Sequence, residues 1–383
     1  YRPVSLTSQV CKIMEKVLLD QLLIHVKKNN ILHCDQHGFQ SNCSCVSQLI
    51  ECLIDWTENY DRPNGKETDN IYLDFSKAFD TVPHRRLIAK LRSVGIRGKV
   101  LNWIQSFLTN RKQRVLLKNG SSTWVKVVSG VPQGSILGPL LFLLYINDLP
   151  DKILSTVKLF ADDTKLYRDI CSHQDCQILQ EDLNRLQAWS CKWLLKFNEK
   201  KCVVLKIKDC VKYIYTLNGS ELQEVEKQRD LGVIINNKLT PADHIHALVS
   251  KANQRIHMIR RCFTGLNENK VTTIFKSIIR PGLEYASITW NPWLKKDKRA
   301  LENIQNRVKR LSNKDLQLES LESRRRRTDL VETYKFVTGK YKTKTSRIFK
   351  QPHRTLRGHC LKLFKPPAKT EVLRNFFAHR VID

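Results

Sequence analysis

Acidic residues that could bind metal ions occur in two short segments of the chain. Asp74 lies within a short apolar run at residues 71–75. Asp162 and Asp163 are adjacent and separate two apolar runs at residues 157–161 and 164–167, which is the pattern of a β-hairpin with acids at its tip. Two neighbouring carboxylates repel one another unless solvent or a cation separates their charges. A divalent cation is therefore a natural partner of this pair.

Two-metal nucleotidyl transfer needs carboxylates in such positions. Carboxylates that hold two ions about 3.5–4 Å apart help to activate an attacking hydroxyl group and to neutralise the leaving phosphates. The chain between Asp74 and the Asp162–Asp163 pair is long enough for a sheet to bring these acids together. Hard oxygen ligands favour Mg²⁺, with Mn²⁺ as a substitute. An acid at the end of an apolar strand is also typical of helix caps and turns, so each segment alone is weak evidence.

The elements that must position these acids follow from the hydrophobic pattern. Apolar residues recur with a helical period at residues 10–26 and 45–60. Asp80 and Pro83 have the features of a helix start, with Asp80 as the cap and the helix ending before Gly95. Asn119-Gly120 predicts a hairpin turn between strands at 114–117 and 123–128. Further helices are expected at 99–108, 136–146 and 176–195, further strands at 203–207, 211–217 and 230–235, and mainly helices from residue 244.

The charge of the chain favours a polyanionic partner. The 383 residues include 66 Lys and Arg against 37 Asp and Glu, which gives a net charge of +29. Residues 241–383 contain 32 of these basic residues against 12 acidic ones. Phosphate neutralisation is a common reason for such an excess, although a solvated basic surface is the alternative. The longest apolar run, residues 136–146, is shorter than the ~20 residues of a membrane span, so we expect no membrane partner.

The cysteines indicate a reducing, intracellular setting. Twelve cysteines are scattered without a paired framework, and a chain of this length does not need a disulfide scaffold. The densest group of soft metal ligands has a spacing that matches no common zinc finger, so packing cysteines are favoured over a zinc site there. This group comprises His33, Cys34, His37, Cys43 and Cys45.

Three segments in order, residues 72–80, 129–139 and 160–163, resemble motifs A, B and C of reverse transcriptases, specifically those of non-LTR (LINE-type) retrotransposons of the jockey-like kind. Residues 1–6 and 36–39 resemble the fingers motifs of this family, residues 197–202 its motif D, residues 230–233 its primer grip, and residues 280–285 and 357–359 its downstream region. The resemblance covers nearly the whole chain.

This resemblance implies an α+β fold of the right-hand polymerase type. Fingers and a palm with an antiparallel sheet would occupy residues 1–235, and a helical, basic thumb residues 236–320. A basic, mainly helical C-terminal extension would occupy residues 321–383. The implied activity is RNA-directed DNA polymerisation, in which a primer 3′-hydroxyl is extended on an RNA template. The implied partners are the RNA template, a DNA primer and deoxynucleoside triphosphates, and the implied localisation is intracellular, in the nucleus and cytoplasm.

The resemblance also assigns roles to single residues. Asp74, Asp162 and Asp163 would hold two Mg²⁺ ions, with the carbonyl of Phe75 as a further ligand and Lys201 beside the leaving pyrophosphate. Phe79 would lie under the sugar of the incoming nucleotide and disfavour a 2′-hydroxyl. From the residues alone, a role for Phe79 as an aromatic residue of the core is equally well supported. Contacts to the nucleotide or template would come from Gln133 and Gly134, and contacts to the nucleic-acid backbone from Arg255, Arg260, Arg261 and Lys276.

Departures from the family pattern keep alternatives open. Gln40 stands where the family usually has Arg, and no endonuclease domain precedes Tyr1, so we expect a fragment of a truncated element copy. The first alternative is a catalytically inactive, nucleic-acid-binding remnant. The others are a polymerase that uses ribonucleotides, against which Phe79 argues, and a domain that functions only within a larger polyprotein.

Overall fold

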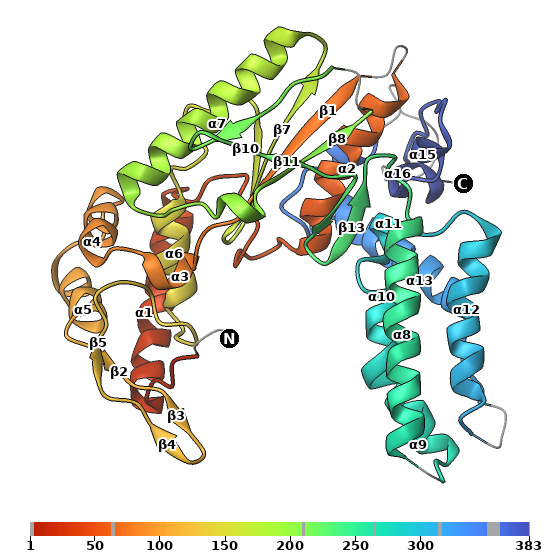
Figure 1. The fold of residues 1–383 in the computed structure, drawn as a ribbon, viewed down its shortest axis with the longest axis horizontal. Helices are drawn as coiled ribbons and strands as arrows, with labels where there is room; N and C mark the ends of the chain where they lie inside the picture. The colour runs from red at the N-terminus through yellow and green to blue at the C-terminus, as the bar shows by residue number, and fades with distance from the viewer. Residues whose placement is uncertain are drawn as a thin grey trace. The chain divides into compact units, whose positions relative to one another are not determined.

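The computed structural model describes residues 4–62, 66–208, 211–263, 265–312, 316–350 and 361–382 (Figure 1). The chain forms two compact units that interleave along the sequence. The first unit contains Tyr1–Ser41, Asp69–Val204 and Val211–Glu224, and the second contains Asn42–Thr68, Leu205–Cys210 and Val225–Asp383. Residues 1–3 and 357–359, which carry parts of the family resemblance, lie outside the described residues.

A five-stranded sheet, most of which belongs to the first unit, has the strand order β11-β8-β1-β7-β6. The strands are β1 (Glu67–Leu73), β6 (Thr156–Phe160), β7 (Asp163–Ile170), β8 (Val203–Ile207) and β11 (Gln223–Glu224). Strands β6 and β7 form an antiparallel hairpin, as expected. The sheet is mixed rather than wholly antiparallel, because the two-residue edge strand β11 pairs parallel to β8. Every residue of β1 is buried, in keeping with its central position in the sheet.

Helix α6 (Gly138–Ile146) fills the core of the first unit. Every residue of this helix except Pro139 is buried, so a sequence that is apolar all round fits a helix enclosed on all sides. The expected helices beside it are confirmed, and the apolar core contains side chains from each of them. They are α4 (His84–Ser93), α5 (Gly98–Leu108) and α7 (His173–Trp193).

Helix α1 (Gln9–Lys28) confirms the expected helix but not the face that its apolar pattern indicates. Val10, Ile13 and Val17 are 78%, 68% and 56% exposed, whereas Glu15 is fully buried. Leu22 and Val26, in the last two turns of the helix, reach the core as expected. The first half of the helix therefore buries a carboxylate and leaves an apolar strip exposed. Glu15 can be buried because two backbone N–H groups of the first unit donate hydrogen bonds to its carboxylate.

The remaining elements of the first unit are short. The expected strands at 114–117 and 123–128 are four two-residue strands, and the turn lies at Lys118-Asn119, one residue before the predicted Asn119-Gly120. The expected strand at 211–217 is reduced to β9. These elements are α3 (Ala78–Thr81), β2 (Lys112–Gln113), β3 (Leu116–Leu117), β4 (Gly120–Ser121), β5 (Val125–Lys126), the 3₁₀ helix η1 (Glu199–Lys201), β9 (Thr216–Leu217) and β10 (Ser220–Glu221).

The second unit is mainly helical, as the pattern after residue 244 predicts. It begins with α2 (Cys45–Asp61), whose N-terminus is capped reciprocally by Ser44 and Ser47. The expected strand at 230–235 is instead a hairpin of β12 (Lys227–Asp230) and β13 (Val233–Asn236). The helices that follow are α8 (Ala242–Cys262), α9 (Glu268–Ile274), the π-helix η2 (Phe275–Ile279), α10 (Arg280–Glu284), α11 (Ser287–Trp290), α12 (Lys295–Lys309), α13 (Leu321–Val337), α14 (Thr345–Ile348), α15 (Glu371–Arg374) and α16 (Phe377–Arg380).

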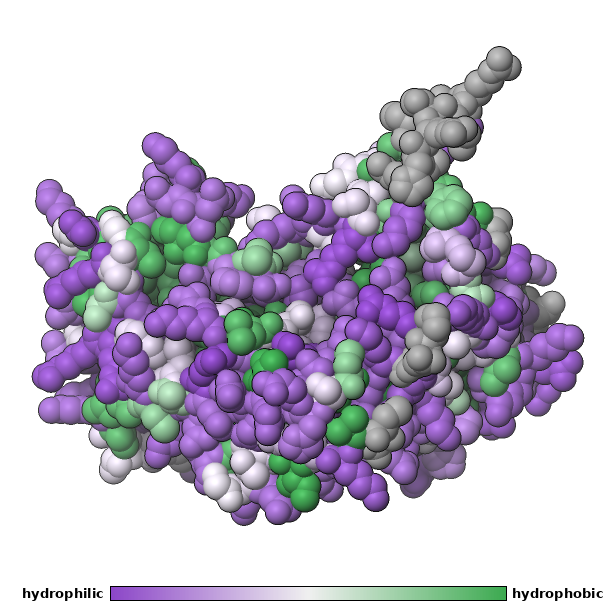
Figure 2. Space-filling view, turned by 90° about the horizontal axis from the view of Figure 1, so that it is seen from above, coloured by the Kyte–Doolittle hydropathy of each residue, from purple (hydrophilic) through white to green (hydrophobic). Residues whose placement is uncertain are grey.

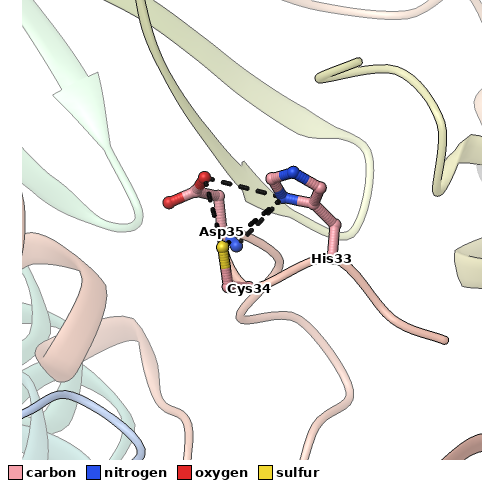
Figure 3. A group of neighbouring side chains, drawn as sticks. All are labelled: His33, Cys34 and Asp35. Carbon is pink, nitrogen blue, oxygen red and sulfur yellow. Dashed lines mark hydrogen bonds and ion pairs between the residues drawn. The ribbon is translucent and has the colours of Figure 1, made fainter. Parts of the chain in front are cut away.

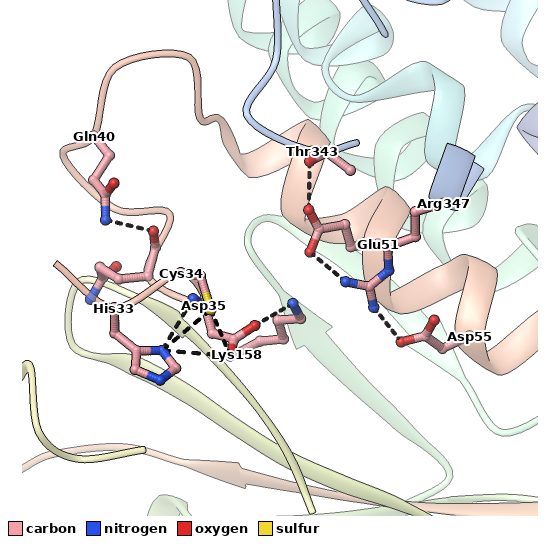
Figure 4. A network of polar contacts seen from close by, with 10 residues as sticks. His33, Cys34, Asp35, Gln40, Glu51, Asp55, Lys158, Thr343 and Arg347 are labelled. Atoms are coloured by element: carbon pink, nitrogen blue, oxygen red, sulfur yellow. Dashed lines mark hydrogen bonds and ion pairs between the residues drawn. The ribbon is translucent and has the colours of Figure 1, made fainter. Parts of the chain in front are cut away.

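Ion pairs connect α2 to the C-terminal part of the second unit. Glu51 accepts a hydrogen bond from Thr343 and pairs with Arg347, which also reaches Asp55 at 2.8 Å (Figure 4). The Asp61 carboxylate accepts the backbone N–H of Thr370 at 2.6 Å. These contacts hold Thr343, Arg347 and Thr370 against an acidic helix.

The surface of the protein agrees with its high content of charged residues. Figure 2 shows mostly hydrophilic residues on the face that it displays, with apolar residues in scattered groups. Within the part of the chain that the structure describes, each helix is too short or too polar to cross a lipid bilayer. The mixture of helices and sheet confirms the α+β class.

Candidate active site

The hairpin of β6 and β7 presents Asp162 in its turn. Ala161 and Asp162 form the two-residue turn, and Ala161 has a positive φ of 53°, as such turns require. Asp163 is the first residue of β7 and pairs with Phe160, so the turn lies one residue earlier than the predicted Asp162–Asp163 tip. Asp162 is half-buried and Asp163 is exposed. The two acids therefore differ in their access to solvent.

Gln36 holds this turn in place. Its side-chain oxygen accepts the backbone N–H of Gly38 at 2.7 Å and that of Ala161 at 2.9 Å, and the Gln36 side chain is 2% exposed. The segment also pairs with β6, because His37 N–H donates to the carbonyl of Leu159 at 2.8 Å. Gly38 has to lack a side chain, because a Cβ there would lie 2.2 Å from the nitrogen of Ala161. The fingers-like segment 36–39 thus fixes the backbone next to Asp162.

Asp74 directly follows β1, the neighbour of β7 in the sheet. The carbonyl of Asp74 accepts the N–H of Asn198 at 2.7 Å, and the Phe75 ring stacks on Phe197 with centroids 4.5 Å apart. Lys201 follows in η1, and its Nζ lies 3.2 Å from Oδ2 of Asp74. The structure therefore brings two residues with predicted catalytic roles, Asp74 and Lys201, into direct contact.

Oδ2 of Asp74 is a buried oxygen that receives no hydrogen bond from the described residues. The ammonium of Lys201 balances its charge without hydrogen-bond geometry, and the Lys201 side chain is 64% exposed. A buried carboxylate oxygen without a donor fits a cation, since unsatisfied buried acceptors are costly. The donor set of Asp74, Asp162, Asp163 and the Phe75 carbonyl consists of hard oxygens, which suits Mg²⁺ or Mn²⁺.

The glycine-rich segment after β5 pairs with the chain around α3. Val131 N–H donates to the carbonyl of Phe79 at 2.8 Å, and Gly130 lacks space for a Cβ, which would lie 2.6 Å from the carbonyl oxygen of Asp80. The Gln133 amide donates to the Asp80 carboxylate at 2.8 Å. Gly134 has a φ of 101°, which favours glycine.

The predicted role of Asp80 as a helix cap is wrong. Asp80 lies inside the short helix α3, and the next helix, α4, begins after Pro83 without a side-chain cap. The Asp80 carboxylate instead orients Gln133, so the contact joins the segments that resemble motifs A and B.

Phe79 connects these segments to the hairpin turn. Its ring stacks on Phe142 of α6 with centroids 4.3 Å apart and meets Phe39 edge-on at 6.4 Å. Phe39 follows Gly38, which abuts Ala161 in the turn. Phe79 is half-buried, so part of its ring packs in the core and part is accessible. A continuous series of contacts thus runs from the turn with Asp162 to the segment that follows Asp74.

The carboxylates of Asp74, Asp162 and Asp163 do not all lie within 4.8 Å of one another. Among the described residues, the group that meets this criterion is His33, Cys34 and Asp35 (Figure 3). His37, Cys43 and Cys45 do not join it. Asp35 pairs with Lys158 at 2.6 Å, and Nδ1 of His33 accepts the Asp35 N–H at 3.2 Å (Figure 4). These contacts already occupy the ligand atoms, so the cluster acts as a polar network.

Comparison with known proteins identifies the family. A family model described as reverse transcriptase (RNA-dependent DNA polymerase) matches residues 1–217, more than half of the chain. The chain belongs to the reverse transcriptase family. The resemblance of its motifs to this family is therefore confirmed, and the polymerase type of its α+β fold follows from the membership. Reverse transcriptases generally depend on divalent metal ions.

Similar proteins come from non-LTR retrotransposons, as the motifs predict. The chain is 29% identical over 330 residues to "Probable RNA-directed DNA polymerase from transposon BS" of Drosophila melanogaster, covering 81% of this chain and 36% of that protein. It is 30% identical to "RNA-directed DNA polymerase from mobile element jockey" of Drosophila funebris, covering 75% of this chain and 32% of that one. The chain thus spans about a third of the length of these relatives. A solved telomerase from Candida tropicalis is similar at 12% identity and a TM-score of 0.42, covering 79% of this chain and 52% of that one.

Two buried ionisable residues of the chain were not singled out from the sequence. The Glu15 carboxylate accepts the backbone N–H groups of Ile136 and Leu137 at 2.7 and 3.0 Å, just before α6. Lys90 lies in a cage in which its Nζ is 3.8 Å from the ring centroid of Trp193 and pairs with Asp148. Burial lowers the pKa of Lys90 to about 8, although Asp148 opposes this shift. Both helices carry several other charged residues, so their sequences give no signal that singles out Glu15 or Lys90.

The basic residues expected to contact nucleic acid differ in their surroundings. Arg260 and Arg261 lie exposed at the C-terminal end of α8, and Lys276 is exposed on η2. Arg255 is half-buried, and its guanidinium donates to the carbonyl of Ile278 at 2.6 Å. Arg255 therefore has a packing role within the second unit.

Each of the four consecutive arginines in α13 has a partner within the second unit, although Arg326 and Arg327 stay largely exposed. Arg324 and Arg327 pair with Glu284 and Glu319, and Arg326 pairs with Glu322. Arg325 is 2% exposed and donates to Asn291 at 3.2 Å. Trp290, the last residue of α11, is buried in the core of the second unit.

Proposed function

We propose that this chain is an RNA-directed DNA polymerase that extends a DNA primer 3′-hydroxyl on an RNA template with deoxynucleoside triphosphates. The observation that carries the proposal is the placement of the acids on neighbouring strands of one sheet. Asp74 follows β1, while Asp162 and Asp163 lie where β7 begins. Membership of the reverse transcriptase family supports this reading.

Two divalent cations would be held by Asp74, Asp162 and Asp163, with the Phe75 carbonyl as a further ligand. Mg²⁺ is the expected ion, and Mn²⁺ can replace it. When bound, the ions supply activation of the primer hydroxyl and neutralisation of the phosphate charge. The buried, donor-free oxygen of Asp74 supports this assignment.

The other site residues act on the nucleotide and the template. Lys201 lies beside Asp74 and is largely exposed, so its ammonium can approach the leaving pyrophosphate. The accessible part of the Phe79 ring can lie under the nucleotide sugar, since Phe142 holds its other face. Gln133, oriented by Asp80, and Gly134 would contact the templating pair.

Nucleic-acid backbone contacts are proposed for the exposed cations of the second unit. Arg260, Arg261 and Lys276 have accessible charges, whereas Arg255 would contribute by holding α8 against the carbonyl of Ile278. In the functional division of the chain, residues 1–235 form the fingers and palm, residues 236–320 the thumb, and residues 321–383 a basic extension. An enzyme of this kind acts on RNA and chromosomal DNA, so we place it in the cytoplasm and nucleus.

Primer extension with an isosteric variant tests the proposed function. The purified chain is incubated with a DNA-primed RNA template, Mg²⁺ and the complementary deoxynucleotide. Asp162→Asn removes one carboxylate charge from the hairpin turn, and Glu221→Gln makes the same change at an exposed position on β10. We expect extension to fall to background in the first variant and to persist in the second. Equal extension by both variants would refute the assignment, and RNA binding without any extension would identify an inactive binding protein.

A further inference from the structure

A cavity of about 840 Å³ lies in the first unit, outside the group of acids. Its walls come from the start of α4, the chain after α5 and the segment that contains β5. Five of the fourteen residues that line it are arginine or lysine, and none is acidic. These side chains are Arg85, Arg86, Arg111, Lys112 and Lys126, which together define the basic groove.

The charges of the basic groove are not neutralised by the protein. Within the described ranges, none of the five side chains has a carboxylate partner within 4.0 Å. The arginines of α13 differ, because Arg324 and Arg327 pair with glutamates. Five uncompensated cations around one cavity repel one another, and an anionic ligand would relieve this repulsion.

Backbone carbonyls hold two of these arginines without reducing their charge. Arg111 donates to the carbonyl of Leu108 at 3.1 Å and to that of Gly130 at 3.2 Å. Arg86 donates to the carbonyl of Lys192. The guanidinium groups are therefore oriented in advance, which lowers the entropy cost of binding a ligand. Arg85, Lys112 and Lys126 are exposed and can reach a ligand that enters.

His84, on the same wall, is buried and shares a carbonyl partner with Arg111. Its Nε2 lies 2.9 Å from the Gly130 carbonyl, which also receives Arg111. Burial lowers the pKa of His84, and the charge of Arg111 lowers it further. His84 is thus neutral at pH 7 and adds no charge to the groove.

The basic groove adjoins the candidate active site through the pairing of α3 with the glycine-rich segment. Thr81, Pro83 and Ser129 also line the cavity. The Ser129 hydroxyl donates to the carbonyl of Asp80, whose carboxylate holds Gln133. A strand that passes the site of nucleotide addition can therefore continue into the groove.

We propose that the basic groove binds the phosphodiester backbone of the single-stranded RNA template, outside the site of chemistry. This inference rests on the proposed polymerase function for the identity of the strand. Contacts to several consecutive phosphates are favoured by three features of the groove. It contains no acids, its cations come from three chain segments, and backbone carbonyls hold two of its arginines. The groove therefore contributes affinity that depends on salt and not on base sequence.

The test measures RNA binding, so it does not depend on turnover. Fluorescence anisotropy of a labelled single-stranded RNA is followed from 50 to 300 mM salt in EDTA. The variant Arg85→Gln/Lys112→Gln/Lys126→Gln removes three groove charges. The control Lys27→Gln/Lys28→Gln/Lys152→Gln removes three exposed charges elsewhere in the first unit.

The groove variant should lose about 2 units of the slope of log affinity against log salt, since each phosphate contact to a single strand contributes ~0.7. The control should keep the wild-type slope. Equal slopes in the two variants would overturn the proposal. A single-stranded DNA of the same sequence forms a second arm: a loss confined to DNA would overturn the assignment to RNA, and a loss with RNA supports it.

Failure of the groove and failure of the proposed function give different results. If the slope changes but the chain does not extend primers, the groove binds RNA and the proposed polymerase function is refuted. If primer extension is normal but the slopes are equal, the polymerase function stands and RNA binding by the groove is refuted.

Discussion

Gln36 offers a test of how the fold positions the catalytic turn. Its side-chain oxygen is the acceptor for the buried N–H groups of Gly38 and Ala161, at 2.7 and 2.9 Å. The change Gln36→Met keeps the approximate volume but removes this acceptor. Each buried donor left without a partner costs about 1–3 kcal/mol, so the free energy of unfolding should fall by about 2–6 kcal/mol. Because Asp162 follows Ala161 directly, primer extension should fall as well.

Thermal unfolding and primer extension of the same preparations measure these effects. Gln105→Met on α5 is a matched control, because Gln105 is exposed and should change the stability by no more than about 0.5 kcal/mol. Gln36→Met should unfold at a clearly lower temperature than this control. A Gln36→Met variant with the stability and the activity of Gln105→Met would refute the idea that Gln36 holds the turn.

Two further predictions concern Lys90 and Phe79. The pKa of Lys90 is about 8 in the folded state and near 10.5 in the unfolded chain. Between these two pH values the unfolded chain binds more protons, so the free energy of unfolding should rise with pH. Relative to Lys90→Met, we expect this rise to be about 3 kcal/mol. Urea denaturation of both proteins between pH 7.5 and 10.5 measures this difference, and parallel pH profiles would contradict the lowered pKa of Lys90. Phe79→Val should raise incorporation of ribonucleotides relative to deoxynucleotides at least several-fold, because the ring no longer blocks a 2′-hydroxyl. An unchanged ratio in single-nucleotide extension would place the ring outside the sugar site.

The sequence predicts the elements around the acids because their patterns are local. The apolar run of α6, the hairpin of β6 and β7 and the start of β8 each follow from periodicity and turn residues within a few positions. The contact of Lys201 with Asp74 could be anticipated from the resemblance to motifs A and D, though not from spacing.

Features that depend on distant partners could not be predicted in this way. Glu15 is buried because it meets two free N–H groups before α6, so the apolar pattern of α1 indicates the wrong face in its first half. Asp80 has the form of a helix cap, but Gln133, far along the chain, decides its role. The basic groove is assembled from three segments that lie far apart in the sequence, so no local pattern predicts it.

The most direct test of the central claim is the metal dependence of primer extension on an RNA template. The wild-type chain should extend a DNA primer with deoxynucleotides in Mg²⁺, stop in EDTA, and recover when Mg²⁺ or Mn²⁺ is restored. Extension that continues in EDTA would contradict a site built on Asp74 and Asp162. A folded, RNA-binding chain that extends no primer with either metal would contradict the polymerase function itself.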